Sequence, residues 1–420
     1  MHPLREMTIG HAAEGDPPWR SEIRRAGHEA FQSGDMPSSR QEQWRYVELP
    51  FDLHELGLAS GQGPSAGDEL AVAVRPEAAL QVVDGRAASA GGGRLVSLRR
   101  ALDEGSAAAL AASAAATPVT LDLFAAAHAA FGGDGALLHL AKGDDSSEPH
   151  YVDLVAASPG VSFPSVWVEM EEGSSASLVV HLRSTGEGDA IVVPQYAVHL
   201  GPNSRLQLTI VQNLGYGDRT IGHARVVADR DASIELFEVG IGGALARLDL
   251  TGRLEGDGSA AAVLGAYFGD GSQTIDYRYF MDHIGRNTRS DMFLKGAVED
   301  EAVSVFSGLI RIEETGQKTE AFQTNRNLLL SEGATAQSVP NLEILANDVK
   351  CGHASSVGPL DDEQRYYLMS RGLDRERASR LQVRGFFEEV LARIPQRSIV
   401  PTVRQWVNRK YVLAQQEGRV

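Results

Sequence analysis

The sequence predicts a mainly β protein whose centre is a solenoid of parallel strands and whose two ends are helical. Short Val, Leu and Ile runs alternate with Gly, Asp, Asn and Pro turns from about residue 137. Turn-forming and apolar positions recur there at one spacing, and helical periodicity is found only outside that part. We therefore expect a mainly helical N-terminal region with a linker (1–136), a β-helix core (137–358) and a C-terminal helical domain (359–420).

The repeat is the strongest evidence for the solenoid. Gly173, Gly201, Asp229 and Asp257 recur at a constant interval of about 28 residues. After each of them, apolar side chains stand first at Leu178, Leu206, Ile234 and Ala262, and then at Val180, Leu208, Leu236 and Leu264. A coil of this length holds two or more strands with their turns. A β-sandwich has similar turn spacing but no reason for a fixed phase, so we prefer a β-helix.

Several elements are expected in the N-terminal region. Apolar spacing after Pro17 and Pro18 predicts a helix over Pro17–Ser33. A helix is also expected over Thr120–Phe131, with Thr120 as its N-cap. The intervening chain predicts a compact aromatic segment, a Gly/Ser/Pro linker, short strands, and an Ala-rich surface helix or disordered lid, in that order: Ser38–Leu53, Ala59–Gly67, Ala71–Val83 and Gly105–Thr117.

Helical periodicity returns after Gly358 and Pro359. Asp361 and Asp362 begin a helix that runs to about Arg371 and ends at Gly372. A second helix begins at Asp374 and stops at Pro395, and a third spans about Ser398–Gln416. The solenoid therefore ends in a coil that contains Cys351, beside an open sheet edge. Such an edge is a natural docking site for another strand.

Composition limits the functional classes. The formal charge of −17 argues against general nucleic-acid binding. The acid–base balance is uneven, because residues 361–420 hold 12 Lys and Arg against 8 Asp and Glu, which suggests a separate surface for a partner. A single cysteine fits the reducing cytoplasm. Met1–Gly15 does not resemble a signal peptide, and no apolar run is long enough to span a membrane.

Cys351 and His353 are the candidate site. If their segment is a strand, the thiol and the imidazole project from the same face, because residues i and i+2 do so. Such a pair suits zinc, copper or iron–sulfur chemistry. Lys350, and His353 beside it, are expected to favour the thiolate. The alternative is that Cys351 is a small buried apolar residue without chemistry.

Other chemistry is absent from the sequence. There is no phosphate-binding loop, since Gly316–Thr319 lacks the residues that would cradle a phosphate, and no H-E-x-x-H, G-x-S-x-G or C-x-x-C motif. The solenoid histidines lack ligand spacing and are expected to be surface or hydrogen-bonded core residues: His181, His199, His223 and His283.

The segment from Lys318 to Ile394 resembles the SufB/SufD family of iron–sulfur cluster assembly proteins. The resemblance rests on ordered motifs, namely Lys318-Thr319-Glu320, Asn327–Ser331, Pro340–Ile344, Asp348–His353, Asp362-Glu363-Gln364 and Ser370-Arg371-Gly372. Glu42–Tyr46 is similar to a SufD element, and no cysteine lies near Gly333, where SufB-like members carry their essential one. Within the family the chain is therefore most like SufD.

The resemblance implies a right-handed parallel β-helix and a cytoplasmic, non-catalytic scaffold subunit. SufB would pair with the last coils, and the ATPase SufC would bind the C-terminal helices. Cys351 and His353 occupy the family's Cys-x-His positions, which implies that they help hold a transient iron–sulfur cluster at the SufB interface. A homodimer is expected when the chain is alone, and these residues do not decide whether a flavin associates. This chain has Gly352 where the family often has Ser, so local flexibility would differ.

Three other interpretations stay open from the sequence. The chain could be a SufB-like paralogue that carries the cluster itself. It could be a β-helix carbohydrate-active enzyme, for which Asp229 and Asp257 share a phase, although turn chemistry explains these residues more simply. It could also be a purely structural solenoid.

Overall fold

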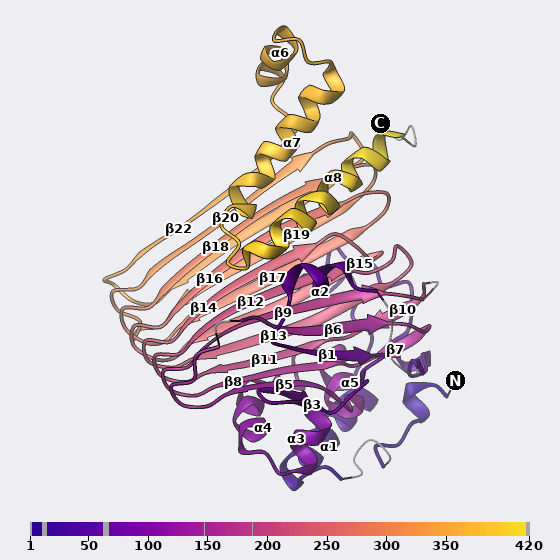
Figure 1. The fold of residues 1–420 in the computed structure, drawn as a ribbon, viewed down its shortest axis with the longest axis vertical. Helices are drawn as coiled ribbons and strands as arrows, with labels where there is room; N and C mark the ends of the chain where they lie inside the picture. Colours follow the sequence, from indigo (N-terminus) through magenta and orange to yellow (C-terminus); the bar gives the residue numbers. More distant parts are fainter. Residues whose placement is uncertain (1, 11–14, 62–66, 147, 187, 417–420) are drawn as a thin grey trace.

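A computed structural model describes residues 2–10, 15–61, 67–146, 148–186 and 188–416. Two long sheets face each other and run the length of the molecule (Figure 1). From β8 onward successive coils place their long strands alternately in the two sheets, and the neighbouring strands are parallel. This is the predicted β-solenoid between helical ends.

Each sheet is described by its strands in spatial order. The first sheet contains β2 (Arg86–Ala87), β1 (Ala78–Val83), β6 (His150–Ala156), β9 (Ser175–Ser184), β12 (Arg205–Asn213), β14 (Ser233–Gly240), β16 (Ala260–Gly269), β18 (Arg289–Val298), β20 (Glu320–Leu329) and β22 (Lys350–Gly358). The second contains β21 (Thr335–Ile344), β19 (Val303–Ile312), β17 (Thr274–His283), β15 (Leu245–Leu254), β13 (Arg219–Ala228), β11 (Gln195–Leu200), β8 (Ser165–Met170), β5 (Gly135–Leu140), β4 (Leu95–Ser97) and β3 (Gly91–Gly92). Short strands β7 (Gly160–Ser162) and β10 (Ala190–Val192) pair with each other, and β10 also pairs with β13.

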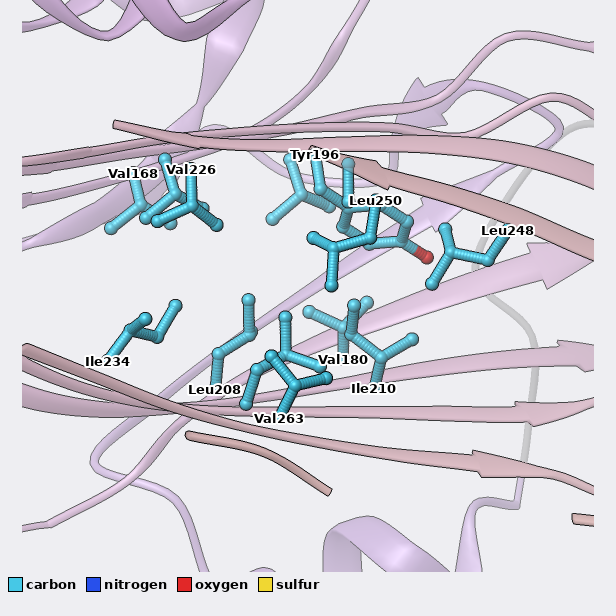
Figure 2. Packing of buried hydrophobic residues seen from close by; sticks show 14 of the residues in the cluster. Val168, Val180, Tyr196, Leu208, Ile210, Val226, Ile234, Leu248, Leu250 and Val263 are labelled. Carbon is cyan, nitrogen blue, oxygen red and sulfur yellow. The ribbon is translucent and has the colours of Figure 1, made fainter. Parts of the chain in front are cut away.

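The main core fills the space between the two sheets. Alternate side chains of each strand point inward, and Figure 2 shows Leu208 and Val263 from one sheet opposite Val226 and Leu250 from the other. Each inward position is stacked on the equivalent position of the next coil. Burial of these aliphatic columns stabilises the solenoid, at roughly 25 cal/mol per Å² of apolar surface removed from water.

The constant interval of the predicted repeat is wrong in detail. The step along the chain from one stacked position to the next varies between coils, because the turns differ in length. Leu178 stacks on Leu208, and Ile234 stacks on Ala261. The phase therefore slips by one position at Ala262, which faces outward, and Leu264 packs under the C-terminal helices instead of in the main core.

Helices and short strands cover the N-terminal end. The elements are η1 (Leu4–Glu6), α1 (Pro18–Ser33), η2 (Glu42–Trp44), η3 (Leu53–Glu55), α2 (Glu69–Val74), α3 (Leu98–Asp103), α4 (Ala107–Ala112), η4 (Ser113–Ala115) and α5 (Leu123–Phe131). Side chains of α1 and α5 pack on the second sheet with those of β7, β10 and β13. Strand β1 pairs in parallel with β6, so the N-terminal region extends the solenoid's own sheet.

Three N-terminal predictions need correction. Ala71–Val83 is not all strand. Asp68 caps helix α2, which buries Leu70 and Val74, and only the later part of the segment, β1, is extended. The Ala-rich segment forms a helix and not a lid, but one face of this helix packs into the core, since Ala109 and Ala112 are fully buried. The N-cap of α5 is Asp122, whose carboxylate accepts from the Ala125 N–H. The predicted linker lies largely outside the described residues.

Three C-terminal helices follow β22, as expected: α6 (Asp362–Ser370), α7 (Arg375–Leu391) and, after η5 (Arg397–Ile399), α8 (Val400–Gln416). Helices α7 and α8 lie across the outer face of the first sheet (Figure 1). Lys410 on α8 is buried and bonds Asp270 at 2.7 Å, and Lys295 on β18 pairs with Glu389 on α7. Among the described residues, no helix combines the length and apolar character needed to cross a membrane.

Candidate functional site

The last coil of the solenoid, formed by β21 and β22, is open. Each of these strands is hydrogen-bonded on one side only and forms the edge of its sheet (Figure 1). Neither strand has a fully buried residue, whereas every residue of β6 and β8, near the other end, is buried. Apolar side chains of the last coil are exposed, including Ile344, Leu345 and Val357. An edge of this kind is prone to pair with another chain.

The backbone of β22 directs a row of hydrogen-bonding groups outward. Lys350 donates its N–H to the Thr319 carbonyl beside β20, at 2.9 Å. Successive residues of a strand point their backbone groups to opposite sides. Those of Cys351, His353, Ser355 and Val357 therefore face the open edge.

Strand β21 has a less regular outer edge. Thr335 at its start and Leu345 just after its end both donate toward β19 and its flanking turns. By the same alternation, Pro340 directs its backbone to the other side, where it has no N–H to offer. The outer edge of β21 therefore lacks a backbone N–H donor in its middle. The outer edge of β22 has an N–H at every outward position.

Cys351 and His353 lie on the inner face of β22, separated by one residue. Their register partners on β20 are Ala321 and Gln323, both of which are buried inside the solenoid. Cys351 is half-buried and packs against the main core, while His353 is exposed at the mouth of the coil. The predicted common face is therefore present. Gly352 does not require glycine, because a Cβ there would meet only the Phe322 ring at 3.6 Å.

The predicted activation of the thiol by Lys350 is wrong. Lys350 projects from the opposite face of β22, and its ammonium pairs with Glu320 at 2.9 Å. Partial burial raises the pKa of the Cys351 thiol above its ordinary value. The thiol therefore gives up its proton less readily than an ordinary cysteine does. A metal would have to displace that proton, so His353 is the more readily available ligand.

Three buried amide side chains line the interior directly below the mouth. Gln323, Asn325 and Asn327 occupy consecutive inward positions of β20, in register with His353, Ser355 and Val357. Asn325 and Asn327 bond each other at 2.7 Å and bond the hydroxyl of Tyr267. The sequence carries a signal for this polar strand, although the signal is not a known motif. Residues 322–327 have no apolar face in either alternation, which is unusual for a central strand.

The chain matches the family described as "SUF system FeS cluster assembly, SufBD core domain" over residues 154–386. It is 32% identical to the iron–sulfur cluster assembly SufBD family protein Rv1462 of Mycobacterium tuberculosis, over 88% of this chain and 87% of that protein. The chain belongs to the SufB/SufD family.

Two further relatives of the family carry the name SufD. The SufD of Bacillus subtilis is 34% identical over 64% of this chain and 62% of that protein. The SufD of Escherichia coli is 28% identical over 55% of this chain and 57% of that protein. The chain is thus SufD-like within the SufB/SufD family, as its sequence motifs indicated.

The four histidines that the sequence predicted to be structural all have hydrogen-bond partners. His181 bonds Asp68, His199 bonds Glu169, His223 bonds Asp122, and His283 bonds Thr288 and Ser290. Two of these histidines belong to compact groups of potential metal ligands, Asp68–Asp153–His181 and Asp122–His223–Asp249. In each group a guanidinium already takes a cation's place, Arg183 on Asp153 and Arg247 on Asp249. We interpret both groups as ion-pair networks.

The SufD-like element Glu42–Tyr46 has a packing role in this structure. Trp44 lies over the Arg247 guanidinium, 3.8 Å from ring centroid to Cζ, and the Gln43 carbonyl accepts from the same group. Arg247 bridges Asp249 and the buried Asp276. The motif therefore covers a buried charge network on the second sheet, far along the chain from Cys351.

Proposed function

We propose that this chain is a non-catalytic scaffold subunit of an iron–sulfur cluster assembly complex. It pairs with a SufB partner through its open last coil, binds the ATPase SufC through its C-terminal helices, and helps to hold the nascent cluster at the SufB interface. The observation that carries the proposal is the coincidence of two features in β22: an unpaired edge and an inward His353 without a hydrogen-bond partner among the described residues.

The edge of β22 supports pairing with SufB. Its outward backbone groups form an uninterrupted row, while a strand added to β21 would meet a gap at Pro340. A partner strand on β22 would satisfy these groups and cover Val357 and its neighbours. The same edge explains the expected homodimer of the chain alone, because an unpaired edge accepts a second copy when no SufB is present.

The ligand set supports a shared cluster. One thiol and one imidazole leave an iron site incomplete, so the missing ligands must come from a second chain. The partner that covers the edge lies where those ligands are needed. Because partial burial disfavours the Cys351 thiolate and His353 is exposed, His353 contributes more than Cys351 in this proposal.

Helix α6 supports binding of the ATPase. It has no buried residue and projects beyond the body of the molecule (Figure 1). Tyr366, Tyr367 and Met369 are exposed on it, and a cavity of about 460 Å³ separates it from α7 and the end of β20. Exposed aromatic side chains on one short helix fit a protein partner. The chain has no phosphate-binding loop, so ATP hydrolysis belongs to that partner in the proposal.

The carbohydrate-active alternative finds no support in the placement of its acids. Asp229 and Asp257 lie in the turns before β14 and β16, and the Asp257 carboxylate accepts from the Arg286 N–H at 2.8 Å. Both residues form turn structure, so we do not propose this function.

The test is iron and acid-labile sulfide per complex, measured after anaerobic purification from cells that express the chain with SufB and SufC. His353→Ala should lower the cluster content more than Cys351→Ala, because a partner cysteine can replace a thiol but the last coil holds no second histidine. Ser356→Ala, on the outer face of β22, is the matched control. Wild-type cluster content in the His353→Ala complex would refute the ligand role.

A further inference from the structure

The inward column that ends at His353 changes character one coil below it. From the capped end upward, the stacked residues are His150, Leu178, Leu208, Leu236, Val263, Met292, Gln323 and His353. The residues from Leu178 to Met292 are apolar and buried, and His150 at the capped end is buried against the Ser146 hydroxyl. Gln323 is also buried, with 1% of its surface exposed. An amide in such a column costs free energy unless both of its polar ends are paired.

The amide of Gln323 makes a hydrogen bond at only one of its two ends. Its Nε2 donates to the Asn341 carbonyl on β21 at 3.0 Å, so the side chain crosses the interior below the mouth. Its Oε1 is buried and has no hydrogen-bond partner in the described structure. Space for this oxygen is made by Gly308 on β19, where a Cβ would overlap it.

His353 needs such an acceptor if it binds metal. An imidazole that ligates through one nitrogen almost always donates its other N–H to an oxygen, which fixes the tautomer and the ring orientation. Gln323 is its register partner on the adjacent strand, about 4.8 Å away along the sheet. The charged side chains nearby cannot serve as this acceptor, because they lie on the outer face. Glu320 of β20, for example, pairs there with Lys350 of β22.

We propose that Gln323 is a positioning residue for His353: its Oε1, which lies beside Gly308 in the free chain, turns to accept the imidazole N–H when the ring turns inward to hold the cluster. This inference rests on the proposed ligand role of His353 and adds the group that orients it.

The test compares variants of the assembled complex with SufB and SufC. Gln323→Leu keeps the approximate size of the side chain and removes the acceptor, and Gln323→Glu keeps an acceptor. Gln337→Leu, on the outer face of β21, is the control. We expect iron loss to a chelator to be about tenfold faster in Gln323→Leu, as for other groups that orient ligand histidines, and near the wild-type rate in Gln323→Glu. The histidine nitrogen coupling of the reduced cluster, measured by pulsed EPR, should weaken only in Gln323→Leu.

The outcomes separate this inference from the proposed function. If His353→Ala loses the cluster while Gln323→Leu keeps wild-type iron retention and nitrogen coupling, the positioning role is wrong and the ligand role stands. If His353→Ala keeps the cluster, both fall. Gln323→Met, which repeats Met292 one coil below, replaces the Leu variant if that complex fails to assemble, and normal values in it would equally refute the positioning role.

Discussion

The two ends of the solenoid are built differently. At the N-terminal end, β6 and β8 are buried on both faces, and helices and short strands cover the sheets. At the other end, β21 and β22 have no buried residue, and the interior beneath them changes from aliphatic to amide side chains. The N-terminal end therefore has the closed, fully buried core of an ordinary folded domain. The second end has unpaired backbone groups and a half-paired Gln323, as expected of a surface that another chain completes.

The comparison can be tested first by removing the same side chain at both ends. Leu154 on β6 and Leu342 on β21 both point inward, but Leu154 is buried between two strands and Leu342 is half-covered. Leu154→Ala should lower the free energy of unfolding of the isolated chain by about 4 kcal/mol, and Leu342→Ala by about 1 kcal/mol, because only the first leaves a closed cavity. Equal losses in urea denaturation would contradict the contrast between the ends.

The interior between the two ends contains a buried carboxyl group that should make stability depend on pH. Burial raises the pKa of Glu238 from 4.5 to about 7, and Tyr279 donates to its carboxyl. The folded chain therefore keeps this proton while the unfolded chain loses it, so stability falls as pH rises from about 4.5 to about 7. The loss from this one group is about 3 kcal/mol.

Glu238→Gln removes that titration and keeps an acceptor for Tyr279. Other groups titrate in the same interval, so the measurement is the difference between the variant and the wild type in urea denaturation across this range. The variant should gain stability relative to the wild type as the pH rises from about 4.5 to about 7, and the difference should stay constant at higher pH. A constant difference at all pH values would show that Glu238 does not hold its proton.

The open edge should be sensitive to a single proline. Ser355→Pro removes an outward N–H of β22 without removing a bond to β20, so the isolated chain should stay folded. We expect affinity for SufB to fall about a hundredfold, since a ladder bond is lost and the ring obstructs the added strand. Ser355→Ala keeps the N–H and serves as the control. Normal affinity of the proline variant in titration calorimetry would place the interface elsewhere.

The smallest expected effect concerns α6, which is the most exposed helix of the open half. Replacing Tyr366 and Tyr367 by Ala should weaken binding of SufC about tenfold, because exposed aromatic anchors carry much of a protein interface. The melting temperature should not change, since neither side chain is buried. Leu110→Ala, an exposed residue near the capped end, is the control. Unchanged SufC binding by the double variant would remove α6 from the interface.

The sequence alone determined the solenoid, its helical ends and the family. Alternation of apolar residues and recurrent turns are local signals, and each coil repeats them, so the class could be read without contacts. The motif around Cys351 and His353 placed both residues on one strand, and the position of Pro359 placed that strand in the last coil. These conclusions depend only on spacing along the chain.

The tertiary structure decided what spacing does not encode. Unequal turns shifted the register, so Ala262 faces outward although its place in the repeat predicted an inward residue. The residues from Ala71 onward have the pattern of a strand, but Leu70 and the residues after it form helix α2. Leu70 is buried there by contacts with α8 and its neighbours.

The chemistry of the site was decided in the same way. Lys350 points away from Cys351, partial burial raises the pKa of the Cys351 thiol, and Gln323 lies under His353. Each of these features depends on a neighbour in the preceding coil, and only the stacking of coils brings such distant parts of the chain into contact.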